Sequence, residues 1–217
     1  MPENGQLRVH GQGDVEVELV VAYLNDFRFA YNGVLVFEES IEGWQRATRH
    51  LPFPFWEIEG AFAWSSFRRS GRLIRESVTA PEDLGLLIPK SEQLVLSGVT
   101  LQSPGFWDFL GRLNPLGVLC QYLNDRHERR KDRQYRESAE ERRLRLENLQ
   151  RENEVIAGRI KIAKDIGATE RDLALLLNQL VYRPLAGLDR HQDLGTINVA
   201  EIQRQLDRPS KHGRIVP

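Results

Sequence analysis

The densest group of side chains able to do chemistry is a basic cluster near the middle of the chain. Between residues 126 and 136 the sequence places six cations: Arg126, Arg129, Arg130, Lys131, Arg133 and Arg136. Cations at this density can bind the phosphates of nucleic acid or of lipid headgroups. Glu128, Asp132 and Glu137 lie among them at helical spacing and can neutralise them on a solvated helix. The cluster therefore predicts either an anion-binding surface or an ordinary charged helix face.

Residue types that carry catalysis or bind metals show no recognisable arrangement. The five histidines are not spaced as metal ligands and are expected at the surface, and the single Cys120 is expected to be a buried structural thiol. Nucleophile elbows, phosphate loops and dinucleotide fingerprints are absent from the sequence. We therefore expect no catalytic residue, no metal site and no cofactor. An enzyme with a pocket in residues 53–110 is the alternative, because scattered carboxylates such as Glu57, Glu59 and Asp108 could converge on folding.

Apolar residues beyond the basic cluster repeat with the spacing of a heptad. The series is Leu146, Leu149, Asn153, Ile156, Ile160 and Ala163. Such a seam predicts a coiled coil, and an Asn at an a position fixes register and favours two strands. The sequence therefore predicts a homodimer or higher oligomer through these six residues. The alternative is a hairpin within one chain, in which residues 173–188 fold back onto residues 156–166.

The elements that would position these residues can be read from their spacing. Alternating apolar residues predict strands around residues 7–9 and 94–101, with a bulge at Gly98. A 3–4 spacing predicts a largely buried helix over residues 15–36. Pro115 can begin a helix, and no strong breaker follows before Gly167, which predicts one helix over residues 115–166, about 75 Å long. Thr169 and Asp172 then form a capping-box-like start for a short helix.

The expected fold is α+β. We divide the chain into an α+β domain (1–104), a linker segment with the long coiled-coil helix (105–166), a short packed helix (167–190) and a loose C-terminal segment (191–217). The formal net charge of −1 gives no overall bias toward nucleic acid or anionic membranes. One cysteine excludes an intramolecular disulfide, and the N-terminal residues lack a signal-peptide pattern, so we expect a cytoplasmic protein.

Residues 105–123 leave a membrane role open. Aromatic and aliphatic side chains crowd this segment directly before the basic cluster, an arrangement that suits a peripheral membrane protein. The competing interpretation is that the segment packs into the α+β core.

The run "LVLSGVTLQSPGFWDFLGRLNPLGVLCQYLNDRHERR", residues 94–130, resembles a group of small effector-associated components of bacterial conflict systems. This resemblance implies a non-catalytic adaptor or signalling role in a bacterium and carries over no site residue. From sequence we therefore expect a scaffold that presents its α+β domain to a protein partner. The alternatives are nucleic-acid binding through residues 126–136 and membrane contact through residues 105–123.

Overall fold

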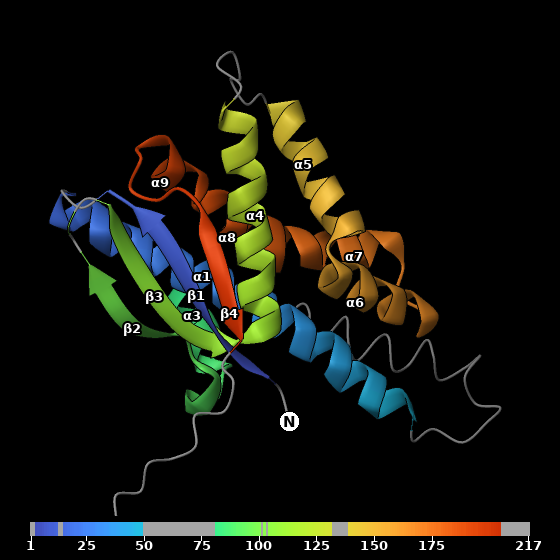
Figure 1. Ribbon diagram of the computed structural model, residues 1–217. Helices are drawn as coiled ribbons and strands as arrows, with labels where there is room; N and C mark the ends of the chain where they lie inside the picture. The colour runs from blue at the N-terminus through green and yellow to red at the C-terminus, as the bar shows by residue number, and fades with distance from the viewer. Residues whose placement is uncertain are drawn as a thin grey trace, which may run out of the picture.

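The computed structural model describes residues 3–12, 15–49, 81–100, 102, 104–131 and 139–204. Four strands form one antiparallel sheet in the order β2-β3-β1-β4, and helices pack against it (Figure 1). The strands are β1 (Asn4–Gly11), β2 (Val95–Thr100), β3 (Gly105–Arg112) and β4 (Ala200–Arg204). The predicted α+β fold class is confirmed.

Alternation along β1 separates a core face from an outer face of the sheet. Leu7 and Val9 are fully buried, while Gln6, Arg8 and His10, which alternate with them, are only half-buried. This period of two is what a strand with one covered face requires. On β3, Trp107 and Phe109 pair with Val9 and Leu7 and are buried on the same face. The sheet therefore has one face built into the core.

Helix α1 (Val17–Arg49) covers that core face. Tyr23, Phe27 and Tyr31 follow one another at four-residue spacing and are fully buried, as expected for one stripe of a helix. The Phe27 ring stacks on Phe109 with 4.2 Å between ring centroids. The predicted helix over residues 15–36 thus exists, and it runs thirteen residues further, to Arg49.

Strand β2 follows the predicted stretch, and its register shifts between Leu96 and Gly98, where a bulge was expected. The opposite edge strand, β4, is covered by α4 (Leu113–Lys131). The Asn124 amide donates to the Ala200 carbonyl oxygen and accepts from the Ala200 N–H, both at 2.9 Å. The side chain thereby occupies the backbone groups of an edge that would otherwise be open to pairing.

The single helix predicted over residues 115–166 is wrong. The described part of this stretch forms α4, α5 (Ala139–Glu152) and α6 (Glu154–Asp165). Asn153 has an extended backbone (φ −79°, ψ 111°), which ends α5 and begins α6. In Figure 1, α5 returns alongside α4 instead of extending it. Asn is a strong N-cap as well as a tolerated coiled-coil residue, so the sequence pattern alone did not separate the two roles.

The chain after α6 continues through four short helical segments. These are α7 (Glu170–Leu177), a π-helix η2 (Asn178–Tyr182), α8 (Arg183–Gly187) and α9 (Asp189–Asp193). The predicted cap of α7 is present, because Thr169 Oγ1 accepts from the Asp172 N–H. Two smaller elements, α3 (Pro81–Leu86) and the 3₁₀ turn η1 (Lys90–Glu92), precede β2.

The sheet draws its strands from three of the four predicted segments. The boundary placed at residue 104 falls between β2 and β3, which are neighbours in one sheet. The segment predicted as loose, residues 191–217, supplies β4 up to Arg204, and residues 205–217 lie outside the described residues. The alternative pocket in residues 53–110 lies partly outside them, because residues 53–80, 101 and 103, with Glu57 and Glu59, are not among the described residues.

Candidate functional site

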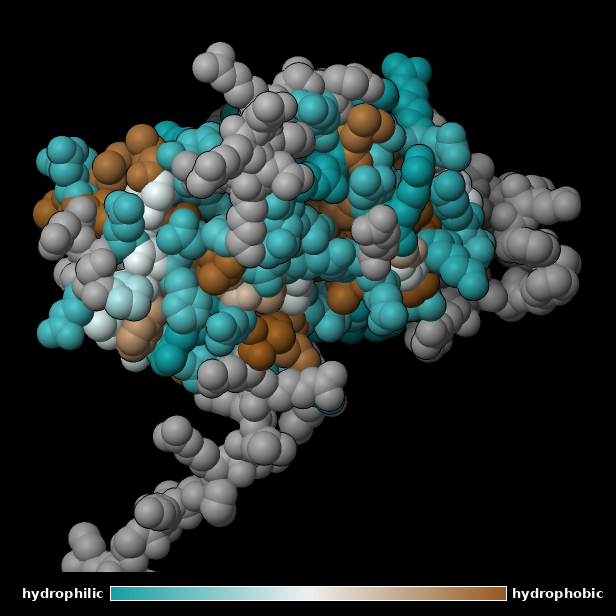
Figure 2. Space-filling view, turned by 45° about the horizontal axis from the view of Figure 1, so that its top comes forward, coloured by the Kyte–Doolittle hydropathy of each residue, from teal (hydrophilic) through white to brown (hydrophobic). Residues whose placement is uncertain are grey.

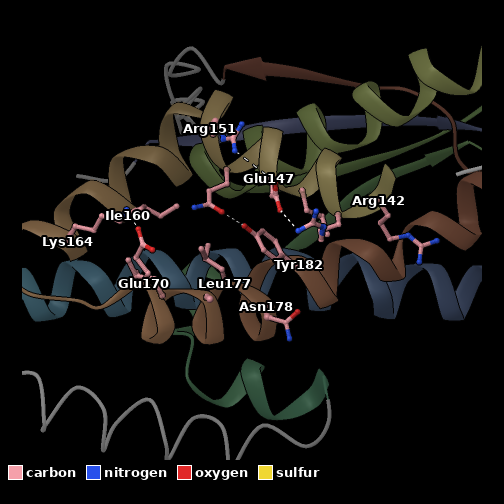
Figure 3. A pocket seen from close by; sticks show the side chains of 14 residues that line it. Arg142, Glu147, Arg151, Ile160, Lys164, Glu170, Leu177, Asn178 and Tyr182 are labelled. Carbon is pink, nitrogen blue, oxygen red and sulfur yellow. Dashed lines mark hydrogen bonds and ion pairs between the residues drawn. The ribbon is translucent and has the colours of Figure 1, made fainter. Parts of the chain in front are cut away.

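Three helical elements enclose a cleft of about 700 Å³. One wall is α5, the second is α6, and the third is the continuous helix formed by α7 and η2 (Figure 3). Ligand sites commonly have volumes of a few hundred to about 1,000 Å³, so the cleft is large enough for one.

The turn between α6 and α7 sets the angle between two of these walls. Gly167 has a φ of +97°, a backbone conformation that favours glycine. The Gly167 N–H bonds to the Lys164 carbonyl and the Ala168 N–H to the Ala163 carbonyl, which closes the end of α6. Because Thr169 then caps α7 at once, the two helices diverge from a short, well-defined corner.

The floor of the cleft is apolar. Leu146 of α5, Ile160 of α6, and Leu173 and Leu177 of α7 line it, and each of them is at most 9% exposed. Leu173 and Leu177 lie four residues apart on α7, the spacing of one helical face. A group that enters the cleft therefore meets a closed apolar surface below it.

The rim of the cleft is charged. It carries four cations and two carboxylates, an excess of two positive charges: Arg142, Arg143, Arg151, Lys164, Glu147 and Glu170. Figure 3 places Lys164 and Glu170 at one end, Glu147 in the middle and Arg142 at the other end. In the space-filling view, hydrophilic residues cover most of the visible described surface, with apolar residues in separate groups (Figure 2).

Five of the six rim charges pair with one another in exposed ion pairs, and Arg142 pairs with the buried Asp189. Glu147 lies 3.2 Å from Arg143 and 4.0 Å from Arg151, and Lys164 lies 3.3 Å from Glu170. Exposed pairs of this kind contribute about 0–1 kcal/mol each, so a charged ligand can displace them at little cost.

The π-helix η2 supplies the polar centre of the cleft. Asn178 and Tyr182 are its first and last residues, and both line the hollow. The Tyr182 hydroxyl donates to Gln150 Oε1 across the cleft, and burial, assisted by Glu147, raises the pKa of Tyr182 to about 12. The hydroxyl is therefore a neutral hydrogen-bonding group at physiological pH. Single π turns inside helices occur often at functional sites.

The six residues predicted to form an oligomer seam are all buried within one chain. Leu149, Ile156 and Ala163 are at most 1% exposed, and Leu146, Asn153 and Ile160 at most 9%. In this conformation the five apolar residues among them belong to the hydrophobic core of their own chain. Leu146 and Ile160 reach the cleft floor, and self-association through this seam stays a prediction.

The predicted anion-binding cluster is not brought together as one described surface. Arg126 is only 7% exposed, and its guanidinium bonds to Asp193 and to the Asp189 backbone carbonyl at 3.0 Å. Arg129 is half-buried on α4. The side chains of Arg130 and Lys131, and all of Arg133 and Arg136, lie outside the described residues.

Sequence reasoning missed a buried charged network that joins α4, α5 and α9. Asp189, 4% exposed, accepts from the Tyr122 hydroxyl at 2.8 Å and from Arg145 at 3.1 Å. Arg126 and Arg142 also reach its carboxylate, at 3.3 and 3.2 Å. Arg145 comes 44 residues before Asp189, and no spacing rule links two charges at that separation. This network ties α5, one wall of the cleft, to α4 and α9.

His191 was expected at the surface and is fully buried instead. Its Nε2 lies 2.8 Å from Asp26 Oδ2, and its ring packs edge-on against Tyr23, with 5.6 Å between ring centroids. Arg190 bonds to the same Asp26 oxygen at 2.7 Å. Among the described residues, no group of three or more His, Cys, Asp or Glu side chains could hold a metal ion.

The apolar segment 105–123 forms β3 and the first half of α4. Trp107, Phe109, Leu116 and Leu119 within it are at most 2% exposed, so these side chains belong to the core. No helix among the described residues combines the length and the apolar character needed to cross a membrane.

Comparisons with known proteins give no relative. No protein-family model matches the chain, and neither the curated proteins nor the solved structures include one that is detectably similar to it.

Proposed function

We propose that this chain is a non-catalytic adaptor that binds a protein partner in the cleft between α5, α6 and α7–η2. The observation that carries the proposal is the cleft itself, about 700 Å³ with an apolar floor and a charged rim. Interaction sites on protein surfaces commonly combine an apolar centre with a polar, solvated rim.

The charges around the cleft suit binding better than bond-breaking chemistry. The rim carboxylates Glu147 and Glu170 each pair with a cation, and the Tyr182 hydroxyl is engaged by Gln150 with its pKa raised to about 12. Groups held in these states can position a partner by charge and hydrogen bonding. The resemblance of residues 94–130 to effector-associated components of bacterial conflict systems favours the same adaptor role.

The cleft is a better partner site than the surfaces considered from sequence. Arg126, the first residue of the basic cluster, is committed to Asp189 and Asp193 inside the fold, which weakens the case for nucleic-acid binding through that helix. Trp107, Phe109 and Tyr122, aromatic residues of the segment considered for membrane contact, are core residues. We therefore place the partner at the helical end of the molecule and not on the sheet.

A site-directed photocrosslink tests this proposal. Ala174 is exposed and lines the cleft, whereas Leu175, the next residue of α7, is 41% exposed and does not line it. Each position receives benzoylphenylalanine in the full chain, and cells that express the chain are irradiated. The proposal predicts a discrete crosslinked protein from position 174 that is absent from position 175. Equal crosslinking at both positions, or none at 174, contradicts it.

A further inference from the structure

Resting on the proposed function, we infer that the partner segment is an α-helix that carries carboxylate, ammonium and carboxylate groups at four-residue intervals. The charges along α5 specify this pattern. Arg143, Glu147 and Arg151 lie four residues apart on the cleft rim, so they form one row along the helix. A row of positive, negative and positive charge is complementary to a row of negative, positive and negative charge.

The spacing of the row fits a helix as the partner. Arg143 and Arg151 are eight residues apart, about 12 Å along the axis at ~1.5 Å per residue. A second helix alongside α5 repeats its side chains at the same interval, so acids eight residues apart reach both arginines at once. An extended strand rises ~3.3 Å per residue and would match the same reach with acids about four residues apart, so the interval of eight residues is specific to a helix.

The net charge of the rim selects an acidic segment. Arg142 and Lys164 add two cations at opposite ends of the cleft, and Glu170 adds one carboxylate. The six charged rim residues have two positive charges in formal excess, of which Arg142 is paired with Asp189 at 3.2 Å, so one positive charge remains. Additional acidic groups toward the ends of the partner helix therefore strengthen binding, and additional basic groups weaken it.

The floor decides how strong the interaction is. Leu146, Ile160, Leu173 and Leu177 are nearly removed from water already, at most 9% exposed, so covering them buries little further apolar surface. Charge pairing at the rim then supplies the discrimination between partners, and exposed charge pairs are weak and screened by salt. We expect a transient, salt-sensitive complex.

Two labelled peptides test the inference with the full chain by fluorescence anisotropy. Both are helix-forming, about 15 residues long, and carry the same leucine stripe. One has Glu, Lys and Glu at four-residue intervals beside the stripe, and the other has Lys, Glu and Lys. The inference predicts that the first binds at least about fivefold more tightly, and that ~0.5 M salt removes most of this difference.

Charge-reversed variants locate the binding. The double variant Arg143→Glu, Arg151→Glu should reverse the preference between the two peptides. Arg171→Glu, on the exposed part of α7 outside the cleft lining, reverses one charge of the same kind and should leave the preference as it is. A reversed preference shows that the variant is folded and that the charged row on α5 discriminates between the charge patterns of the two peptides.

Three outcomes overturn the inference: no binding of either peptide, binding that ignores the charge pattern, or a preference that Arg171→Glu changes as much as the double variant. Preferential binding of an apolar anion such as dodecyl phosphate over both peptides also overturns it. A discrete crosslink from position 174 would still uphold the proposed function in each of these cases. Absence of that crosslink, by contrast, refutes the proposed function itself.

Discussion

Asp189 is the acceptor on which three arginines converge inside the molecule. Arg145, Arg126 and Arg142 all reach its carboxylate, and Arg145 is itself only 1% exposed. A buried ion pair is costly to form, and removal of one partner leaves an uncompensated charge in the interior. The stability of the α4–α5–α9 junction therefore depends on this one carboxylate.

Asp189→Asn should lower the free energy of unfolding by roughly 3–5 kcal/mol, because the buried Arg145 charge loses its counter-ion. Urea unfolding followed by circular dichroism measures the change. Asp193→Asn is the matched control: its side chain is 60% exposed and pairs with the same Arg126, so the loss should stay below about 1 kcal/mol. Equal effects of the two substitutions would contradict this assignment.

Glu38 is a second buried charge site, on α1. Its carboxylate is fully buried and lies 3.8 Å from the Arg159 guanidinium of α6. Burial raises the pKa of Glu38 from 4.5 to about 7, more than Arg159, Arg112 and Asn114 lower it, while Glu42 nearby raises it further. The folded protein therefore holds a proton on Glu38 at pH values where the unfolded chain releases it.

The sign of the pH effect follows from this raised pKa. Stability due to Glu38 is fully present below about pH 4.5 and is lost as the pH rises through about 7. Glu38→Gln removes the titration. Between about pH 5 and about pH 8 the wild-type protein should therefore lose up to about 3 kcal/mol of unfolding free energy relative to Glu38→Gln. Denaturant titrations at the two pH values measure this, and parallel stabilities of the two proteins would refute it.

Burial of individual residues was more predictable than their partners. The 3–4 spacing correctly marked Leu149 and Ile156 as apolar positions of a packed helix face. Either another chain or the same chain folded back can cover this apolar helix face. The spacing of the residues identifies the face but not the element that packs on it. Arg145 and Asp189 carry no periodic signal at all, since a contact between distant charges depends on tertiary structure.

At the scale of elements, Asn153 decides whether α5 and α6 are one helix or two. Its Oδ1 accepts from the Val155 and Ile156 N–H groups at 3.1 and 3.2 Å, and its Nδ2 donates to Gln121 Oε1 at 2.6 Å. The first two bonds cap α6, and the third ties the corner to α4. Both functions require a short polar side chain at this position.

Substitution of Asn153 separates the cap from a coiled-coil position. Asn153→Leu should destabilise the protein by about 1–2 kcal/mol or more, because α6 loses its cap and Gln121 loses a buried partner. Asn153→Ser keeps a capping oxygen and should cost less. At an a position of a coiled coil the Leu variant would instead become more stable, so a rise in the urea midpoint of Asn153→Leu would contradict the cap assignment.

The contact between α1 and η2 depends on a glycine. A Cβ added at Gly33 would lie 2.1 Å from the Leu180 carbonyl oxygen and 3.2 Å from Pro184 Cγ. Since the nearest obstacle is backbone, the helices must separate to admit a methyl group. The close approach holds the π turn, and with it Asn178 and Tyr182, at the cleft.

Gly33→Ala should therefore destabilise the protein by about 1–3 kcal/mol, despite the better helix propensity of alanine. Gly43→Ala is a matched change on the same helix, where an added Cβ meets nothing within 4 Å. That substitution should be neutral or stabilise by up to about 1 kcal/mol. Thermal unfolding of both variants gives the comparison, and stabilisation by Gly33→Ala would show that α1 and η2 are not in contact.

At the scale of the whole molecule, the fold class and the type of most described elements followed from local patterns. β1, β2, α1 and the start of α7 lie where alternation, spacing or capping placed them. The path of the chain could not be predicted from local patterns. The corner at Asn153 and the pairing of β3 and β4 with β1 depend on contacts between residues far apart in the sequence. The cleft exists only because of that path, so no sequence pattern pointed to it.

The proposed function depends on residues 113–165 folding back within one chain. A distance measurement between spin labels at Gly117→Cys and Lys161→Cys, in a Cys120→Ser background, tests this most directly. Magnetic dilution with unlabelled protein restricts the signal to one chain. Gln121 and Asn153 share a 2.6 Å hydrogen bond, so the folded-back chain places the labels within about 35 Å of each other. A single helix from 115 to 166, as in an extended coiled coil, would separate them by roughly 66 Å. The shorter distance supports the cleft and its proposed role, and the longer distance contradicts both.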